Sequence, residues 1–437
     1  MTKRKTLALL GVAAALSLAA TGCGNRSGDN GATTSPTTAA FAVDASKCPT
    51  EATTAVADGQ PLKIGTTLPL SGAAAAIGSA FSAGEQAYIG KVNAAGGVAG
   101  HQIQLVTKDD GYDPTKTVPA FTALVEQEKV LATVGQIGTA NVAGTQPLAE
   151  RTCTPQLWIG TGGPQFGDPV KHPWTTLGFA SYAVEGSAWA TYIAAKKPAA
   201  KVAYIALDND SGEAYANAFK AAADKLGLKI VAAEKHPTTA TNVDTQVTAM
   251  LAASPDYVIA MTAGTPCTLI STGLARGNFH GGVIAAANCG SLNYLNAVGA
   301  GADGQLTISF TGRDPANPAE VDNADIVQFK ADMAKYSPTL PAPLLSQAIN
   351  GYRFGAMLTD TLTAAAKLPG GLTRVNVMNA AWHMDTKVFA TYGGVGKTNG
   401  TADAYLVEYG AWLKYDFSKK ALVPAGDVID AEGKTAA

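Results

Sequence analysis

The stretch from residue 62 to residue 97 reads LKIGTTLPLSGAAAAIGSAFSAGEQAYIGKVNAAGG and contains one strand followed by one helix. Residues 62–68 are mostly apolar or β-branched, which is typical of a buried strand, and PLSG at 69–72 is a turn sequence. Residues 78–93 have the length and composition of a helix, which ends at the glycine pair 96–97. A strand, a turn and a helix in this order form the repeating unit of a parallel sheet, because parallel strands need a crossover connection.

The same unit recurs along most of the chain. Further strands are predicted at 102–107, 131–134 and 156–159, with helices at 113–128 and 143–151. A second series begins after Tyr182, with predicted strands at 202–207, 229–233, 257–261, 283–287 and 305–310, and helices at 184–196, 215–226, 243–253, 268–276, 324–335 and 345–367. Alternating strands and helices indicate parallel sheets with helices on both faces. Two such series predict an α/β fold with two lobes, whose ligand would lie at the carboxyl ends of the strands.

The composition excludes several classes of protein. Of the 437 residues, 47% are hydrophobic and 15% are charged, so the chain can bury sizeable cores and is not disordered overall. At roughly 150 residues per domain, the length suggests about two or three domains. Lys and Arg number 32 against 34 Asp and Glu, a net charge of -2, and they form no long basic block. No nucleic-acid partner is therefore expected, because such a partner requires clustered positive charge.

The N-terminus indicates export from the cytoplasm. A basic segment at 3–5 precedes an apolar run of 14 residues at 7–20, shorter than the roughly 20 residues that span a bilayer. With the small residues that follow, this pattern is typical of a secretory signal peptide over residues 1–22. The next residue, Cys23, resembles the lipidated cysteine of a bacterial lipobox, although Ala20 stands where that motif usually has leucine. An ordinary signal peptide with an incidental cysteine is the alternative.

Residues 23–58 are expected to form a lipidated start and a flexible tether. Much of this segment lacks large apolar residues, so burial of apolar surface cannot offset the conformational entropy that ordering would cost. The protein is therefore expected to be extracytoplasmic, with the lipid on Cys23 as its anchor to the cell membrane.

Four further cysteines are available for disulfides in an oxidising compartment. Cys267 and Cys289 each follow a predicted strand, and neighbouring parallel strands would bring those ends together. A bridge between them would contribute about 3 kcal/mol. Cys48 and Cys153 form the second expected pair. The alternative is that these cysteines are buried free thiols.

The motifs for catalysis and metal binding are weak. TYGGVGKT at 391–398 resembles a phosphate-binding loop, but it begins with threonine where the motif requires glycine, so a glycine-rich turn explains it better. The acids at 208 and 210 fall short of a calcium loop, and Asp210 or Ser211 is expected to cap a helix instead. Scattered histidines and the lack of Cys-x-x-Cys predict no metal site and no cofactor. Since no Gly-x-Ser-x-Gly motif occurs either, we expect a protein that is not an enzyme.

Four short segments carry a family resemblance. They are PLSG at 69–72, VNAAGGVAGHQIQL at 92–105, DDGYDP at 109–114 and TQP at 145–147. In this order and spacing they resemble the leucine/isoleucine/valine-binding protein family, which comprises the receptors of branched-chain amino-acid ABC importers. The resemblance covers roughly residues 60–390.

The resemblance implies the type I periplasmic-binding fold, with two doubly wound parallel-sheet lobes, a hinge and a central cleft. It assigns residues 59–179 plus 312–385 to the N-terminal lobe and residues 180–311 plus 386–437 to the C-terminal lobe.

Ligand contacts are implied in the loops at the carboxyl ends of the strands. In the family, hydroxyls and backbone N–H groups of the loops at 136–144 and 160–163 hold the ligand carboxylate, and a hinge tyrosine adds a contact. The candidates in this sequence are Ser71, Gly138, Thr139, Gly160, Thr161, Gly162, Tyr182, Asp210, Ser211, Thr239 and Arg313. Plain glycine-rich turns, a packing tyrosine and a solvated arginine are the alternatives.

One feature of the family is missing. Its amino-acid binders pair the ligand ammonium with an acid after the strand at 229–233, because an unpaired buried ammonium is costly. Here residues 236–243 contain no acid, and Asp208 or Asp210 would have to substitute for it. The ligand is therefore predicted to carry a carboxylate or another hydrogen-bond acceptor. It is not expected to be a standard α-amino acid whose ammonium group is held by the family's usual carboxylate.

Together these patterns predict an extracytoplasmic solute-binding lipoprotein of an ABC importer. It would capture a small organic solute, an amino acid or a carboxylate-bearing compound, by hinge closure. The expected partners are the small-molecule ligand, the ABC permease with its ATPase, and the membrane through a lipid anchor. A ligand-sensing receptor of the same fold, which delivers a signal rather than a solute, is the alternative function.

Overall fold

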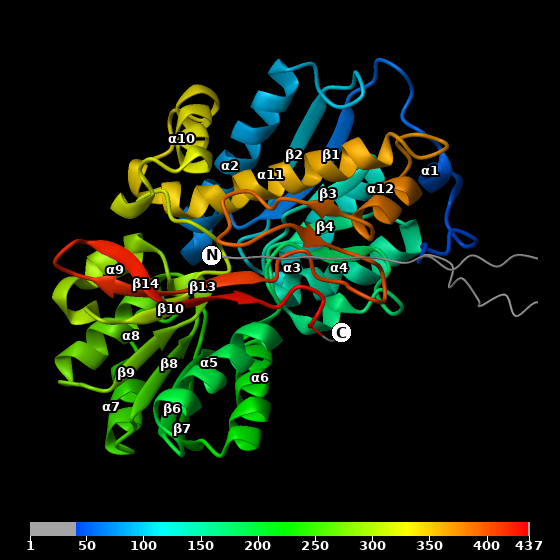
Figure 1. Cartoon of the computed structure of the whole chain (residues 1–437). Helices are drawn as coiled ribbons and strands as arrows, with labels where there is room; N and C mark the ends of the chain where they lie inside the picture. The colour runs from blue at the N-terminus through cyan, green and yellow to red at the C-terminus, as the bar shows by residue number, and fades with distance from the viewer. Residues whose placement is uncertain (1–40, 436–437) are drawn as a thin grey trace, which may run out of the picture. The chain divides into compact units, whose positions relative to one another are not determined.

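Two sheets organise residues 41–435, the part of the chain that the computed structural model describes (Figure 1). The first sheet has five parallel strands in the order β2-β1-β3-β4-β5. These strands are β1 Leu62–Leu68, β2 Ile103–Asp109, β3 Ala132–Val134, β4 Gln156–Ile159 and β5 Thr175–Leu177. This order is doubly wound, and its switch point lies between β1 and β3.

The second sheet has seven strands in the order β14-β13-β10-β9-β8-β6-β7. The strands are β6 Lys201–Leu207, β7 Lys229–His236, β8 Tyr257–Met261, β9 Gly282–Ala285, β10 Leu306–Ile308, β13 Tyr409–Asp416 and β14 Ala421–Asp430. Strands β6 to β10 are parallel and repeat the order of the first sheet, so a second switch point lies between β6 and β8. The strands β13 and β14 extend this sheet antiparallel, which the sequence had not predicted.

Helices connect the strands and cover the sheets. With the first sheet are α1 Thr50–Thr53, α2 Ala75–Ala94, α3 Pro114–Thr122, α4 Thr139–Thr152, α10 Ala324–Tyr336, α11 Leu345–Ala365 and α12 Arg374–Ala381. With the second are α5 Tyr182–Lys196, α6 Asp210–Leu226, α7 Asp244–Ala252, α8 Thr265–Arg276 and α9 Leu292–Val298. A short pair, β11 Asp385–Thr386 with β12 Gly396–Lys397, precedes β13. All described residues belong to one compact unit.

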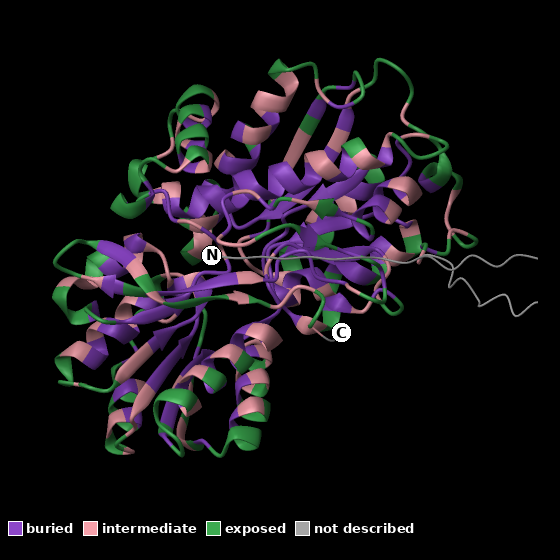
Figure 2. Ribbon diagram, in the orientation of Figure 1, coloured by how far each residue is buried: buried purple, intermediate pink, exposed green. Residues whose placement is uncertain are grey.

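The core of the first lobe is organised around α11. Most of this helix is buried, as its purple ribbon in Figure 2 shows, and it crosses α2 at close range. Gly84 of α2 and Gly351 of α11 lie at the crossing, where each glycine faces the backbone of the other helix. Because neither residue has a Cβ atom, the two helix backbones can approach each other closely.

The segment before β1 packs on the first lobe, although residues up to 58 were assigned to the tether. Val43 and Ala52 are buried, and the Val43 N–H donates to Asn379 Oδ1 at 2.9 Å. The ring of Phe41 meets the edge of Trp382, with centroids 6.0 Å apart. Residues 41–58 are therefore part of the folded body. The signal peptide and Cys23 lie outside the described residues.

Both cysteine pairs expected from the sequence are bonded in the structure. Cys48–Cys153 ties the segment before β1 to the C-terminal end of α4, with Cα atoms 5.6 Å apart. Cys267–Cys289 joins the first turn of α8 to the short helix at Ala287–Cys289, with Cα atoms 5.4 Å apart. Each bridge restricts the unfolded chain and so stabilises the folded one.

The chain passes between the two sheets three times, after β5, after β10 and after β11. Two of these crossings are joined directly, because the Arg313 N–H donates to Ala390 O at 2.8 Å. The exact boundaries of the lobes stay a prediction. Within residues 41–435, no helix combines the length and the apolar character that crossing a membrane requires.

Candidate functional site

A cavity of about 670 Å³ lies at the carboxyl ends of the strands of both sheets. Segments that follow β1 to β5 line it from the first sheet, and segments that follow β6 to β10 line it from the second. Both switch points thus open into one space, which is where doubly wound sheets bind their ligands. The volume falls within the range of about 300–1,000 Å³ that is usual for small-molecule sites.

The turn from β3 into α4 presents a helix N-terminus to this cavity. Gly138 precedes the helix with a φ of 103°, a conformation that glycine adopts without strain, and no side chain caps the helix here. Gly138 and Thr139 line the cavity. The first N–H groups of a helix have no partner within it, and the helix dipole favours negative charge at this end.

The turn from β8 into α8 repeats this arrangement in the second lobe. Gly264 precedes the helix with a φ of 73°, and again no side chain caps it. Gly264, Thr265 and Pro266 line the cavity. The disulfide of Cys267 holds this first turn beside the loop after β9. Two helix N-termini from opposite lobes therefore favour an anionic or acceptor group in the cavity.

Three hydroxyls meet behind the β3–α4 turn. Thr139 and Thr161 share a hydrogen bond of 2.7 Å, and Thr161 Oγ1 lies 3.4 Å from the Tyr182 hydroxyl oxygen. Of these residues, Thr139 and Tyr182 line the cavity, whereas Thr161 lies behind them and is not part of its wall. Thr161 therefore positions the other two hydroxyls. Gly162 is also behind the wall, and a Cβ there would clash with the ring of Tyr182 at 2.6 Å.

Tyr182 belongs to an aromatic stack that sequence reasoning missed. Its ring lies on that of Tyr215, with centroids 3.9 Å apart, and both residues line the cavity. The Tyr215 hydroxyl donates to Glu185 Oε2 at 2.9 Å, and the Ala287 N–H donates to Glu185 Oε1 at 2.6 Å. Burial raises the pKa of Glu185 to about 8. This group fixes the position of the aromatic wall, and no local motif marks its members.

Only two of the described residues that line the cavity, Asp113 and Asp314, carry a carboxylate. Asp113 caps α3 by accepting from the Thr115 N–H at 2.9 Å. Asp314 is buried and accepts from the Leu292 N–H at 2.8 Å and from the Ser346 hydroxyl at 2.6 Å. Burial raises the pKa of Asp314. Both carboxylates are thus already engaged in holding the fold.

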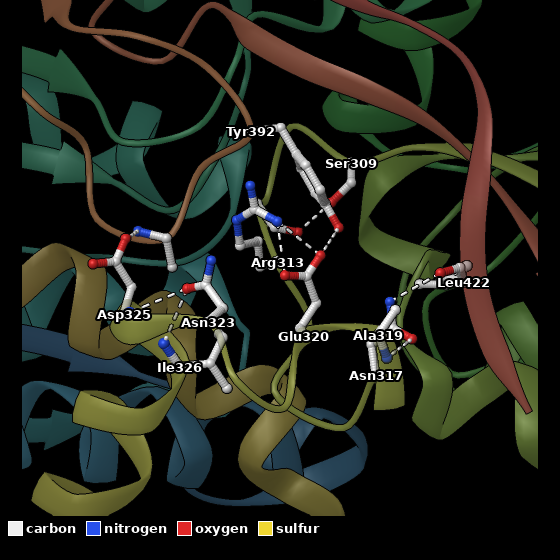
Figure 3. Close-up of polar contacts among 12 residues, drawn as sticks. Ser309, Arg313, Asn317, Ala319, Glu320, Asn323, Asp325, Ile326, Tyr392 and Leu422 are labelled. Atoms are coloured by element: carbon white, nitrogen blue, oxygen red, sulfur yellow. Dashed lines mark hydrogen bonds and ion pairs between the residues drawn. The ribbon is translucent and has the colours of Figure 1, made fainter.

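Arg313 lines the cavity, but its charge is neutralised within the protein. Its Nη1 donates to both carboxylate oxygens of Glu320, at 2.8 and 2.7 Å (Figure 3). The guanidinium also lies 4.4 Å from the centre of the Tyr392 ring, and the Tyr392 hydroxyl donates to Glu320 Oε1. This cluster joins the crossings after β10 and β11. It holds the hinge region together, and Arg313 is not a solvated loop residue.

The remaining sequence candidates divide between the cavity and the surface. Ser211 and Thr239 line the cavity, as does Gly160 from the first lobe. Asp210 and Ser71 are exposed and are not part of the wall, and the Ser71 N–H donates to Asp109 Oδ1. The expected cap of α6 is corrected, because Asn209 accepts from the N–H groups of residues 211 and 212. Asp208, the other substitute acid, pairs with Lys235 at 3.0 Å.

An apolar part of the wall also escaped sequence reasoning. This part of the wall belongs to the first lobe and contains Ile77, Phe81, Ile137, Phe179 and Ile349. In the sequence these residues look like ordinary core positions. The packing of α2 against α11 brings Ile77, Phe81 and Ile349 to the cavity, whereas Ile137 and Phe179 reach it from the loops after β3 and β5.

Comparison with known proteins agrees with this geometry. A family model described as periplasmic binding protein matches residues 61–410. An amino acid binding protein of Pseudomonas aeruginosa is 29% identical over 169 residues, 38% of this chain. The match spans 45% of that relative, which is less than half of its length.

Solved structures share the fold over most of the chain. One is a branched-chain amino acid ABC transporter protein of Thermus thermophilus with bound valine, with TM-score 0.76, 19% identity, and 86% and 97% of the two chains covered. A fatty acid ABC transporter substrate-binding protein of Thermomonospora curvata gives TM-score 0.73, 20% identity and coverages of 87% and 95%. A solute binding protein of R. palustris in complex with 4-hydroxybenzoate gives TM-score 0.72, 16% identity and coverages of 85% and 97%.

The expected fold class, two α/β lobes of the type I periplasmic-binding kind, is confirmed by the two doubly wound sheets and by these structures. The chain therefore belongs to the periplasmic binding protein family, whose members are extracytoplasmic binders of small solutes and not enzymes.

Proposed function

We propose that the protein is the lipid-anchored solute receptor of an ABC importer and that it captures an organic carboxylate by hinge closure. The observation that carries this proposal is the cavity of about 670 Å³ that two uncapped helix N-termini line, α4 from one lobe and α8 from the other. An anion held by both termini is bound better when the lobes are close together. Ligand binding would therefore favour the closed state, which the permease and its ATPase recognise.

The class of ligand follows from the polarity of the wall. Helix termini and the hydroxyls of Thr139 and Tyr182 suit a carboxylate, whereas Asp113 and Asp314 are already engaged and offer no free partner to an ammonium. The apolar residues between α2 and α11 suit a hydrocarbon or aromatic body. The named ligands of the structural relatives, valine, fatty acid and 4-hydroxybenzoate, have a carboxylate in common.

A ligand-sensing receptor of the same fold is the second candidate, because lobe closure can also be read by a sensor protein. A permease and an ATPase encoded beside this chain would support import. A neighbouring sensor kinase would support the second candidate instead.

Native mass spectrometry of the purified protein, followed by calorimetry, tests the ligand class. We expect benzoate-like or fatty carboxylates to bind more tightly than leucine, isoleucine or valine. Sub-micromolar binding of leucine would contradict the proposal, because it would require a carboxylate partner that the wall does not offer.

Thr139→Val should weaken ligand binding by roughly tenfold to a hundredfold, because a hydrogen bond to a charged group contributes about 1.5–3 kcal/mol. The substitution keeps the shape of the side chain and removes only the hydroxyl at the start of α4. Thr191→Val, on the exposed side of α5, is the matched control and should leave the dissociation constant unchanged. If calorimetry gives Thr139→Val the same affinity as the wild type, the Thr139 hydroxyl does not bond the ligand.

Cys23→Ser should release the protein from membranes into the medium, because a serine cannot carry the proposed lipid. The expectation rests on the signal-like sequence before Cys23, which lies outside the described residues. Fractionation of cells with an antibody against the folded body measures the distribution. Thr21→Ser is the control and should stay with the membrane, while persistent membrane association of Cys23→Ser would refute the anchor.

A further inference from the structure

Three carboxylates lie close together outside the ligand cavity, near the start of β13 and the end of β14. They belong to Asp403, Glu408 and Glu432, and the oxygens that could serve as ligands all lie within 4.8 Å of one another. Asp403 lies in the segment between β12 and β13, Glu408 directly precedes β13, and Glu432 follows β14. None of the three lines the ligand cavity.

The backbone holds these carboxylates in place. The N–H of Ala431 donates to the Glu408 carbonyl at 3.1 Å, and the N–H of Gly433 donates to Glu408 Oε2 at 2.7 Å. The Tyr405 N–H donates to Asp403 Oδ1 at 3.3 Å. Three segments of the chain therefore bring the carboxylates together, and backbone hydrogen bonds help to hold them there.

The second observation is a buried oxygen without a donor. Glu408 is 1% exposed, and its Oε1 has no partner at hydrogen-bond geometry among residues 41–435. Both Glu432 oxygens and Thr435 Oγ1 are also buried atoms without such a partner within this range. Buried polar atoms normally find partners, so these oxygens point to a missing positive group.

Nearby lysines do not supply that group. Lys397 Nζ lies 3.5 Å from Asp385, and Lys434 Nζ lies 3.9 Å from Asp430. Both ammonium groups thus pair with exposed acids at the edge of the cluster. A cation between the three carboxylates would satisfy the oxygens directly.

We propose that Asp403, Glu408 and Glu432, with the hydroxyl of Thr435, form a calcium site. Ca²⁺ binds oxygen at about 2.3–2.6 Å, so ligand oxygens on opposite sides of the ion lie about 4.6–5.2 Å apart at most. The ligand oxygens lie within 4.8 Å of one another, so one such ion can reach all of them. Ca²⁺ accepts flexible coordination geometry, whereas Mg²⁺ demands near-ideal octahedral geometry, so carboxylates from three separate segments suit Ca²⁺ better. The sequence predicted no metal site, because its ligands come from separate segments and form no motif.

A bound ion would join the residues after β14 to the segment between β12 and β13. That segment is attached to the first lobe, since the Gly400 N–H donates to Trp382 O at 2.9 Å. Glu408 and Glu432 continue the β13–β14 ladder of the second sheet. Calcium would thus stabilise the connection between the lobes without touching the ligand cavity.

The test is a titration of the chelator-treated mature protein with CaCl2, by calorimetry and by thermal unfolding. We expect one ion per chain, with a dissociation constant of about 10⁻⁴–10⁻³ M, as in extracellular calcium modules. The unfolding midpoint should rise with millimolar Ca²⁺ and less with Mg²⁺. Glu432→Gln should weaken calcium binding by at least about tenfold, because it removes a charged ligand. Asp427→Asn, at an exposed acid of β14, should bind as wild type does.

Three results would overturn the site. They are no heat and no midpoint shift of the wild type at millimolar Ca²⁺, an equal response to Mg²⁺, and undiminished binding by Glu432→Gln. If Glu408→Gln does not fold, Glu432→Gln and the wild-type titration still decide the question. Neither result depends on the identity of the solute in the cavity.

Discussion

Replacing Gly351 with alanine should lower the free energy of unfolding by about 3 kcal/mol or more, the upper range for overpacking of a core. An added Cβ would lie 2.6 Å from the carbonyl carbon of Phe81 in α2. That atom belongs to a helix backbone, so it cannot move without displacing the helix. The close crossing of α2 and α11 would have to open.

Gly84→Ala should have a similar effect from the other side of the crossing. Its Cβ would lie 2.6 Å from the backbone nitrogen of Tyr352 in α11. Since Phe81, Ile349 and Asn350 of these helices line the cavity, ligand binding should weaken as well. Chemical denaturation followed by circular dichroism measures the first effect, and calorimetry measures the second.

Gly144→Ala is the matched control. This glycine is exposed in α4, and its added Cβ would meet only Val118 Cγ2, at 3.2 Å. Alanine is favoured over glycine inside a helix by about 1 kcal/mol, so the control should be neutral or slightly stabilised. Wild-type stability of Gly351→Ala would show that the two helices do not pack as closely as described.

Removing the Cys48–Cys153 bridge should have the second large effect. The bridge closes a loop with a sequence separation of 105, and loop entropy assigns about 4.7 kcal/mol to a loop of about 100 residues. The double substitution Cys48→Ser/Cys153→Ser should therefore lose about 4 kcal/mol. It removes both thiols, so no new bridge can form with the other pair.

The Cys267–Cys289 bridge serves as the comparison. Its sequence separation is 22, so its removal should cost less, about 3 kcal/mol. Denaturation without reductant ranks the two double variants against the wild type. Equal stability of the wild type and Cys48→Ser/Cys153→Ser would contradict the role assigned to the longer bridge.

The regular framework could be read from local sequence. Strand positions such as Tyr257–Met261 follow from short apolar runs, and the intervening helices follow from their length and end signals. Their alternation is sufficient to predict parallel sheets. The cysteine pair 267–289 followed from the same reasoning, because each residue comes soon after a strand of one sheet.

Other elements were missed because their signal is not local. The strand β14, Ala421–Asp430, alternates buried and exposed residues only weakly, and it is held by pairing with β13. Residues 41–58 contain few large apolar side chains, yet Val43 and Ala52 are buried in the core. Asn209 caps α6 in place of the two neighbours that were expected, and all three residue types are capable caps.

The sequence by itself determined the α/β architecture, the family and the loops that surround the cavity, because strand and helix periodicity and glycine-rich turns are properties of adjacent residues. Only the tertiary structure decided which side chains remain available to a ligand. Thr161 turns away to hold Thr139 and Tyr182, and Arg313 is neutralised by Glu320. A polar group is free or engaged according to the partners that distant segments bring to it, and that pairing is fixed when the lobes pack.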